Sequence, residues 1–494
     1  MDSFLKNIKS QTFALNGWDF ISSFANIPFS YYFKNTNSDG ASADFMPSSL
    51  LRASFLRTLQ EFPILAGHLV MDKGRGFIVV DKNNLNMPEY FESQSSIDYK
   101  FVEAGGFSWE SLPHKVATVT ASPSKSASGQ LKLVNVNVVR LRNNSGLVLF
   151  INMPHYVVDG VGYSAFVRRW AEVCTWMQDG KYTTELPHRE YTFDRSLISA
   201  AMTDDMLPLD KPCSRAFATK TLLGQLLARL SPETLGDVLV EGTKLMPATG
   251  HIFHISKRTI TEIRQRIAKT EQVGELRISD NDILTAMISQ AVAQGVEEKS
   301  KTRKFFSSAL RAVTRPLLSK DEFLTLVVAD IRPRLKHLKQ LTSAQYAGGC
   351  ITGMPIFNST SKLVESGSNN TAFAGIAASV RKMVSNLTDE YISGLDYQIG
   401  GNSTSYAHAL ALAITTAEKV IITNQTRFGL YECDFGFGTP KWISPMSSFV
   451  TNFASILPVN PTQDGYNVYL SLEKYVMNSV LKNEFWSQHT DLIY

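Results

Sequence analysis

The spacing of hydrophobic and polar positions changes twice between residues 131 and 178. Apolar residues alternate imperfectly with polar ones over 131–140, which is typical of a strand. Residues 143–146 (Asn-Asn-Ser-Gly) are typical of a turn, and 147–151 form a continuous apolar run, as in a strand buried on both faces. After Gly162 the apolar residues recur with helical spacing. The pattern therefore predicts a hairpin, a buried strand, a loop and a helix.

The predicted loop carries His155 and Asp159, four positions apart, and then Gly160. A histidine held rigidly at the end of a strand can act as a general base on a hydroxyl or an amine. Asp159 has two interpretations: it orients the imidazole directly, or it pairs with a distant arginine and holds the loop. The tightness of the loop and the glycine that follows favour the second.

The same spacing occurs again at His68 and Asp72. His68 ends the segment Phe-Pro-Ile-Leu-Ala-Gly-His, and Asp72 leads into Lys73-Gly74, which indicates a structural segment entering a turn. Spacing alone therefore does not identify a site, and we expect no catalytic role for His68.

Strand and helix patterns recur after residue 250. Residues 251–255 predict a strand, Ser256 is a plausible N-cap for the helix that follows, and 279–282 would cap a helix over 283–295. Residues 326–329 predict a buried strand.

The region 183–250 is the most linker-like part of the chain, with several prolines and a predicted helix at 221–230. A length of 494 residues suits two domains. We therefore predict an α/β protein with mixed sheets, an N-terminal domain at 1–195, a crossover connector at 196–250 and a C-terminal domain at 251–494. Small-molecule enzymes commonly bind their substrates between two domains, so we expect the site between the N-terminal and C-terminal domains.

Composition narrows the classes of function. Hydrophobic residues make up 44% and charged residues 19%, which suits a globular protein with a large core. A mean hydropathy of −0.07 and the lack of an apolar run near 18 residues predict no membrane span, and no secretory signal is visible. A net charge of +4 is too small to predict a nucleic-acid partner. The four cysteines are far apart and lack Cys-x-x-Cys spacing, so we expect reduced thiols, a cytoplasmic location and no metal site.

Two distant motifs carry a family resemblance. His155 to Gly160 resembles the HxxxDG motif of the BAHD acyltransferases, and 434–438 (Asp-Phe-Gly-Phe-Gly) resembles their DFGWG motif, in the same order. Weaker matches are residues 15–19, 62–67, 330–335 and 346–349. The resemblance covers nearly the whole chain, and we expect a fungal rather than a plant branch.

The resemblance implies two chloramphenicol-acetyltransferase-like domains around a solvent channel. It implies an acyl-CoA co-substrate, no permanently bound cofactor, and a small-molecule alcohol or amine as acceptor. His155 would take the proton of the acceptor, and Asp159 would pair with an arginine of the second domain, for which Arg332 is our first choice. Thr423 matches a threonine or serine near the tetrahedral intermediate and could donate to the oxyanion.

The resemblance also implies that residues 434–438 are structural. The glycines Gly436 and Gly438 would allow tight turns, Asp434 would pair with an arginine, and the segment near 425–445 would pack on the N-terminal domain. We expect a monomer with a role in secondary metabolism.

Ser256, Lys257 and Arg258 stand where a helix N-terminus could help to hold a CoA phosphate. They also belong to a basic cluster, and a solvated surface is the favoured interpretation of that cluster. Both interpretations stay open at this point.

Three departures from the family pattern concern the acceptor. Phe437 replaces the usual tryptophan, Asn424-Gln425 replaces a frequent Ser-Trp pair, and Gly349 replaces an asparagine. They leave the acceptor unspecified without changing the expected reaction class.

Three functions compete: a CoA-dependent acyltransferase, a carrier-protein-dependent condensation enzyme and a non-catalytic ligand-binding relative. Condensation domains usually carry a second histidine where Pro154 stands, and an intact His155, Asp159 and Gly160 speak against the third. No serine or cysteine lies in a recognisable nucleophile motif, which predicts direct transfer without an acyl-enzyme.

Overall fold

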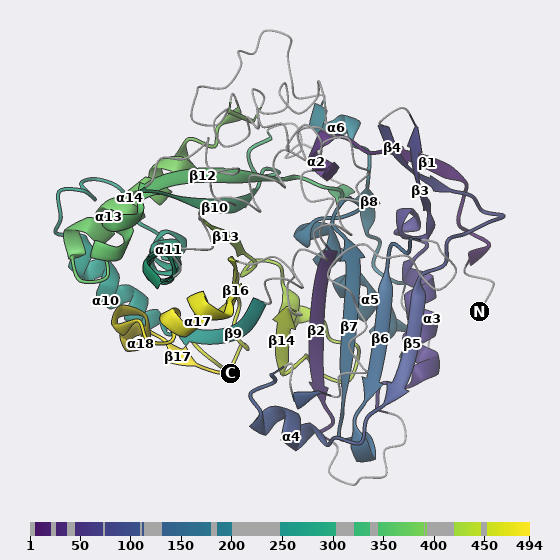
Figure 1. Ribbon diagram of the computed structural model, residues 1–494. Helices are drawn as coiled ribbons and strands as arrows, with labels where there is room; N and C mark the ends of the chain where they lie inside the picture. Colours follow the sequence, from purple (N-terminus) through teal and green to yellow (C-terminus); the bar gives the residue numbers. More distant parts are fainter. Residues whose placement is uncertain are drawn as a thin grey trace.

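The computed structural model describes the following residues: 5–20, 26–36, 45–72, 75–108, 111–112, 131–178, 185–199, 248–302, 321–335, 344–389, 391–392, 419–445 and 452–494. Most of the predicted connector, including the helix expected at 221–230 and Cys213, lies outside these residues. The described chain builds two large sheets, each with its own helices (Figure 1).

The first large sheet has five strands in the order β14-β2-β7-β6-β5. These are β14 (Trp442–Pro445), β2 (Asn26–Lys34), β7 (Gly146–Pro154), β6 (Asn135–Arg140) and β5 (Glu89–Gln94). All nine residues of the central strand β7 are buried, which confirms the prediction of a strand covered on both faces. Helices α3 (Ser48–Thr58) and α5 (Gly160–Gln178) pack on each other, with the Phe55 and Trp170 rings 5.1 Å apart. A rigid strand therefore leads directly into the loop of His155.

The second large sheet has seven strands in the order β12-β10-β13-β15-β16-β9-β17. These are β12 (Ile351–Ser359), β10 (Glu322–Asp330), β13 (Lys419–Asn424), β15 (Phe453–Leu457), β16 (Tyr466–Glu473), β9 (Ala248–Ile255) and β17 (Asp491–Leu492). Strand β13 runs parallel to both of its neighbours, and the other pairs are antiparallel. The mixed α/β class predicted from the sequence is confirmed.

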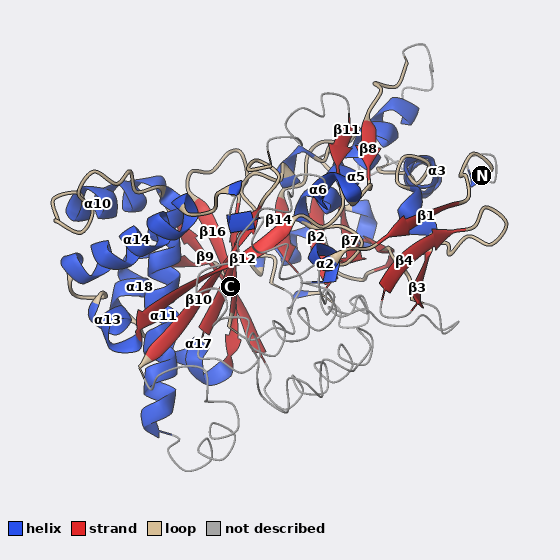
Figure 2. Cartoon of the chain, turned by 90° about the horizontal axis from the view of Figure 1, so that it is seen from above, coloured by secondary structure: helices blue, strands red, loops and turns tan. Residues whose placement is uncertain are grey.

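Helices cover one face of the second sheet (Figure 2). They are α10 (Lys257–Ile267), α11 (Asp280–Thr302), α13 (Thr360–Glu365), α14 (Asn370–Ser385), α17 (Lys474–Val480) and α18 (Glu484–His489). Helix α11 begins earlier and ends later than predicted. At its start, Ser279 and Asp282 exchange hydrogen bonds as a capping box, which fixes the first turn. No helix in the described ranges is both long and apolar enough to cross a bilayer.

The remaining elements are small. A three-stranded sheet holds β1 (Gln11–Ala14), β4 (Arg75–Val80) and β3 (His68–Asp72), and a two-stranded one holds β8 (Glu190–Thr192) and β11 (Ala344–Tyr346). The short helices are α2 (Gly17–Phe20), α4 (Tyr99–Ala104), α6 (Ser196–Ser199) and the 3₁₀ turns η1 (Pro63–Ala66), η4 (Arg142–Asn144) and η6 (Leu430–Glu432).

Late residues of the chain complete the first sheet. Strand β14 pairs antiparallel with β2, so the yellow-green strand lies beside the purple one in Figure 1. Just before β14, the Phe435 ring packs edge-on against Phe33 and Trp170, with centroids 5.6 and 5.2 Å away. The segment therefore anchors the C-terminal part of the chain in the core of the N-terminal part.

Candidate active site

The loop of His155 is fixed at both ends. Strand β7 ends at Pro154, and α5 begins at Gly160. A Cβ on Gly162 would lie 2.0 Å from the carbonyl oxygen of Ala347, and one on Gly160 would lie 2.3 Å from the Phe428 ring. Glycine is needed at both positions because the Ala347 backbone and the Phe428 ring, both from the C-terminal part of the chain, approach α5 this closely.

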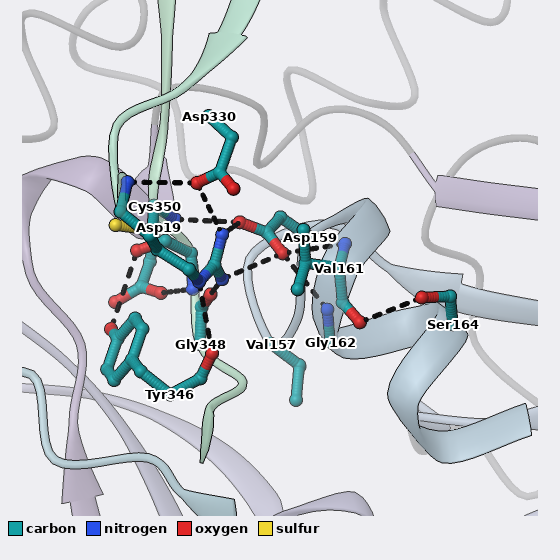
Figure 3. Close-up of polar contacts among 12 residues, drawn as sticks. Asp19, Val157, Asp159, Val161, Gly162, Ser164, Asp330, Tyr346, Gly348 and Cys350 are labelled. Atoms are coloured by element: carbon teal, nitrogen blue, oxygen red, sulfur yellow. Dashed lines mark hydrogen bonds and ion pairs between the residues drawn. The ribbon is translucent and has the colours of Figure 1, made fainter. Parts of the chain in front are cut away.

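Asp159 is the hub that joins the loop to the second half of the chain (Figure 3). Its buried carboxylate accepts hydrogen bonds from the Val161 and Gly162 N–H groups at 3.0 and 3.1 Å, which caps α5. The Cys350 N–H donates at 3.0 Å, and Arg332 Nη1 lies 2.8 Å from Asp159 Oδ2. No hydrogen bond in the described structure joins Asp159 to His155. The bracing interpretation of Asp159 fits this geometry better than direct orientation of the imidazole.

Arg332 is the partner that the resemblance selects for Asp159, and the structure contains this ion pair. The guanidinium also donates to Asp330 Oδ1 at 2.8 Å and to the carbonyl oxygens of Tyr346 and Gly348 at 3.0 and 2.6 Å. Burial works against its charge, but the carboxylates of Asp159 and Asp330 outweigh burial and raise the pKa of Arg332. Arg332 therefore stays charged and holds the end of β10 against the loop.

The electrostatics of His155 suit a proton acceptor. Burial lowers the pKa of the imidazole below its ordinary value, and the negative charge of Asp159 opposes this only in part. The ring is neutral at neutral pH, and no side chain among the described residues hydrogen-bonds to it. A neutral imidazole at a fixed strand end can accept a proton from a bound hydroxyl or amine.

Thr423 lies near the end of β13, in register with Val328 of β10 and Ser455 of β15. Its neighbour Ile422 belongs to the core under the helices, so Thr423 faces the opposite side of the sheet. Strand β10 ends two residues after Val328, at Asp330, which hydrogen-bonds to Arg332. This places Thr423 one strand away from the end of β10 that contacts the Asp159 hub.

The three candidates for holding a CoA phosphate already have partners in or around α10, and Lys257 also contacts the Tyr466 hydroxyl of β16. Ser256 caps α10 by accepting from the Thr259 N–H at 3.1 Å, as predicted. Lys257 Nζ lies 2.9 Å from Asp280 Oδ2, and the exposed Arg258 pairs with Glu262 at 3.0 Å. Each of the three side chains therefore has a protein partner in this structure.

One expectation is wrong: Asp434 does not pair with an arginine in the described part of the chain. Its exposed carboxylate accepts instead from the N–H groups of Gly436 and Gly438, at 2.8 and 3.0 Å. Both glycines have positive φ, 89° and 96°, which turns their N–H groups back toward Asp434. The Asp434 carbonyl accepts from the Thr175 hydroxyl of α5 at 2.9 Å. Residues 434–438 therefore have a structural role, which backbone groups of the segment carry.

A second buried ion pair near the loop was missed by the sequence analysis. Arg195 and Asp19 form two hydrogen bonds of 3.1 Å, and Arg195 Nη2 donates to the Val157 carbonyl at 2.9 Å. Asp19 was noted only as part of a motif, and Arg195 only as part of the linker-like region. A signal exists only for Asp19, which is a charged residue in the largely apolar stretch around Trp18; Arg195 lies among other charged residues and has no local signal.

A family model and several curated relatives match most of the chain. A family model described as the Transferase family matches residues 5–486. The chain is 21% identical over 457 residues to hydroxycinnamoyltransferase 1 of Oryza sativa subsp. japonica, covering 92% of this chain and 90% of the relative. It is 22% identical over 441 residues to phenolic glucoside malonyltransferase 2 of Arabidopsis thaliana, covering 87% and 84%.

Solved structures share the fold. TRI101 of F. graminearum, in complex with coenzyme A and T-2 mycotoxin, superposes with a TM-score of 0.70 at 15% identity and covers 98% of this chain and all of the other. Vinorine synthase gives a TM-score of 0.59 at 15% identity, covering 96% and 94%. A condensation domain of the CDA synthetase gives 0.50 at 12% identity, covering 96% and 93%. At these identities the likeness establishes the fold alone.

Proposed function

Because the chain belongs to the Transferase family, which includes the BAHD acyltransferases, we propose that His155 is the general base of an acyl transfer to a small molecule. The chain is an acyltransferase, and its acyl donor is a CoA thioester. The acceptor group, a hydroxyl or an amine, and the roles of individual residues are our proposals. The observation that supports the role of His155 most strongly is the Asp159 hub, which fixes the loop against both halves of the chain.

The proposed reaction is a direct transfer. The His155 imidazole takes a proton from the acceptor while the acceptor oxygen or nitrogen forms a bond to the thioester carbonyl carbon. The electron pair of the carbonyl moves to oxygen, and the Thr423 hydroxyl donates to this oxyanion. When the carbonyl re-forms, the carbon–sulfur bond breaks, and the CoA thiolate takes the proton from the imidazolium. The products are an ester or amide and free CoA.

We also propose that the helix N-terminus at Ser256, Lys257 and Arg258 binds a CoA phosphate. Arg258 supports this best, because its side chain is 87% exposed and its partner Glu262 is exposed too. An anion could displace such a surface ion pair at small cost. Lys257 is already paired with Asp280, so its contribution would require that pair to open.

The test is a panel of acyl donors against mixed alcohols and amines. The donors are acetyl-, malonyl-, hydroxycinnamoyl- and long-chain acyl-CoA, and the readout is free CoA thiol. We expect saturable release that depends on both donor and acceptor. Transfer only from a carrier-protein thioester would contradict the proposal in favour of a condensation enzyme. A covalent acyl adduct on the protein, seen by intact-mass measurement, would contradict direct transfer.

Broader properties of the protein are proposals as well. We propose a monomer that acts in the cytoplasm in secondary metabolism and that stems from a fungal branch. We also propose the domain division at 1–195, 196–250 and 251–494. The two large sheets support the division, while the BAHD names among the relatives support the metabolic role. Sedimentation equilibrium with and without acyl-CoA tests the monomer.

A further inference from the structure

The ion pair of Asp19 and Arg195 lies in the interior of the protein. The exposed fractions are 1% for Asp19 and 5% for Arg195. Asp19 is on the short helix α2, and Arg195 follows β8, so the partners are 176 positions apart in the sequence. Both carboxylate oxygens receive an N–H group of the guanidinium. The geometry is the bidentate one that fixes orientation as well as distance.

Arg195 contacts the catalytic loop itself. Its Nη2 donates to the carbonyl oxygen of Val157 at 2.9 Å, and its Nη1 donates to the carbonyl of Phe193 at 2.9 Å. Val157 lies two residues after His155 and two before Asp159. The loop is therefore held from two sides: by Arg332 at Asp159 and by Arg195 at Val157.

Asp19 contacts the second half of the chain. Its Oδ1 accepts from the Gly349 N–H at 3.2 Å, and the next N–H group, that of Cys350, donates to Asp159. Two successive amides of one segment are thus bound by two buried carboxylates of the other half. A Cβ on Gly349 would lie 2.8 Å from Asp19 Oδ1, so the glycine that departs from the family pattern makes room for this contact.

The charge of this pair is costly to bury. Burial raises the pKa of Asp19, and the nearby Arg195 counteracts this rise. Buried ion pairs add little net stability over apolar residues of similar size, whereas removing one partner is strongly destabilising. A pair of this kind therefore needs a reason other than stability, and its contacts suggest positioning.

We propose that the Asp19–Arg195 pair is a positioning clamp for the reaction: through the Val157 carbonyl and the Gly349 N–H, it holds the His155 loop at the distance from the second half that transfer requires. The inference rests on the proposed role of His155. Both residues act through the backbone of others, so they are positioning residues and not catalytic ones.

The experiment compares Arg195→Lys, Asp19→Asn and the uncharged double variant Asp19→Asn/Arg195→Met with the wild type. Arg189→Met is the matched control, because Arg189 is a nearby but exposed arginine that pairs with Glu172. For each we measure kcat, KM for both substrates, the number of acetyl-CoA sites per chain by calorimetry, and the free energy of unfolding.

We expect Arg195→Lys to keep one acetyl-CoA site per chain and a KM within about twofold of the wild type, while kcat falls about 10- to 100-fold, since small misplacement of a reacting group has effects of this size. Lysine keeps the charge but cannot hold both Asp19 oxygens and Val157 in the same fork. The double variant removes both buried charges, so it tests the clamp even if a single variant does not fold. We expect the same loss of kcat in it, and no change in Arg189→Met.

A folded double variant with wild-type kcat would overturn the proposal. The proposal would also be overturned if kcat fell in each variant by the same factor as the number of acetyl-CoA sites per chain, because the loss of activity would then reflect loss of folded protein. Those results would leave the pair a purely structural one. If His155→Ala is inactive while all Arg195 variants are normal, only the clamp fails. If the wild type itself transfers no acyl group, or if His155→Ala is fully active, the proposed function fails instead.

Discussion

The chain contains two histidines with an aspartate four positions later, and the structure gives them different surroundings. His68 and Asp72 are the two ends of β3, a strand in a small three-stranded sheet, and Asp72 is exposed. His68 Nε2 lies 3.0 Å from the Asn84 carbonyl. His155 and Asp159 lie in a tight loop, and Asp159 is fully buried. Equal spacing has therefore produced a surface hairpin in one place and a braced loop in the other.

The difference shows that a spacing of four residues between histidine and aspartate does not determine how the two side chains are placed. Along an extended strand, four residues span about 13 Å, which separates a histidine from an aspartate. In the second copy the chain turns after Pro154, and the aspartate meets the amides of α5, the Cys350 amide and Arg332. The partners of the aspartate, and not the distance to the histidine in sequence, distinguish the candidate site.

The largest effect is expected from removing each histidine in turn. His155→Ala should lower kcat on the order of 10²- to 10⁴-fold, because the general base is lost, while the fold is retained. His68→Ala is the matched control and should leave kcat unchanged. Initial rates of CoA release measure both. Comparable losses in the two variants would erase the distinction between the two copies.

The next effect concerns the aspartates. Asp159→Asn should lower the free energy of unfolding by about 3–5 kcal/mol, because it removes one charge of a buried pair and leaves Arg332 without full compensation. Asp72→Asn changes an exposed side chain and should stay within about 0.5 kcal/mol of the wild type. Urea unfolding followed by circular dichroism measures both. A stable Asp159→Asn variant would show that the hub does not brace the loop.

A smaller effect on the free energy of unfolding should distinguish alanine substitutions at two helical glycines, Gly162 and Gly375. Gly162→Ala should cost about 1–3 kcal/mol, because a Cβ there would lie 2.0 Å from the Ala347 carbonyl and would push the halves apart. A Cβ on Gly375 of α14 would have its nearest neighbour, the flexible Lys362 Nζ, at 3.4 Å, so Gly375→Ala should be neutral or stabilising by up to about 1 kcal/mol. Thermal unfolding compares the two, and equal costs would contradict the close approach at α5.

The sequence predicted local structure well where a single pattern decides it. The buried strand before His155, the N-cap at Ser256 and the strand at 326–329 all follow from periodicity and capping chemistry. The partner of Asp159 was reached through family resemblance and not through periodicity. Local patterns could not supply it, since Arg332 is 173 positions away.

The predictions that failed also concern tertiary contacts, which local sequence patterns do not contain. Asp434 was assigned an arginine, but the positive φ of Gly436 and Gly438 supplies it with backbone donors first. Arg195 was noted only within the linker-like region 183–250, because nothing local shows that the Asp19 carboxylate lies beside it. Long-range pairs of buried charges are the part of the site that the sequence pattern does not contain.

The central claim is that the setting of His155 makes it the general base, and the pH dependence of kcat/KM tests this most directly. The acceptor should be an alcohol that does not titrate in the range used. Since the base must be neutral, activity should fall as pH drops through the pKa of His155, which burial holds below its ordinary value near 6.5. The account predicts this acid limb in the wild type and in His68→Ala, and its absence from the residual rate of His155→Ala. An acid limb that persists unchanged in His155→Ala would contradict it.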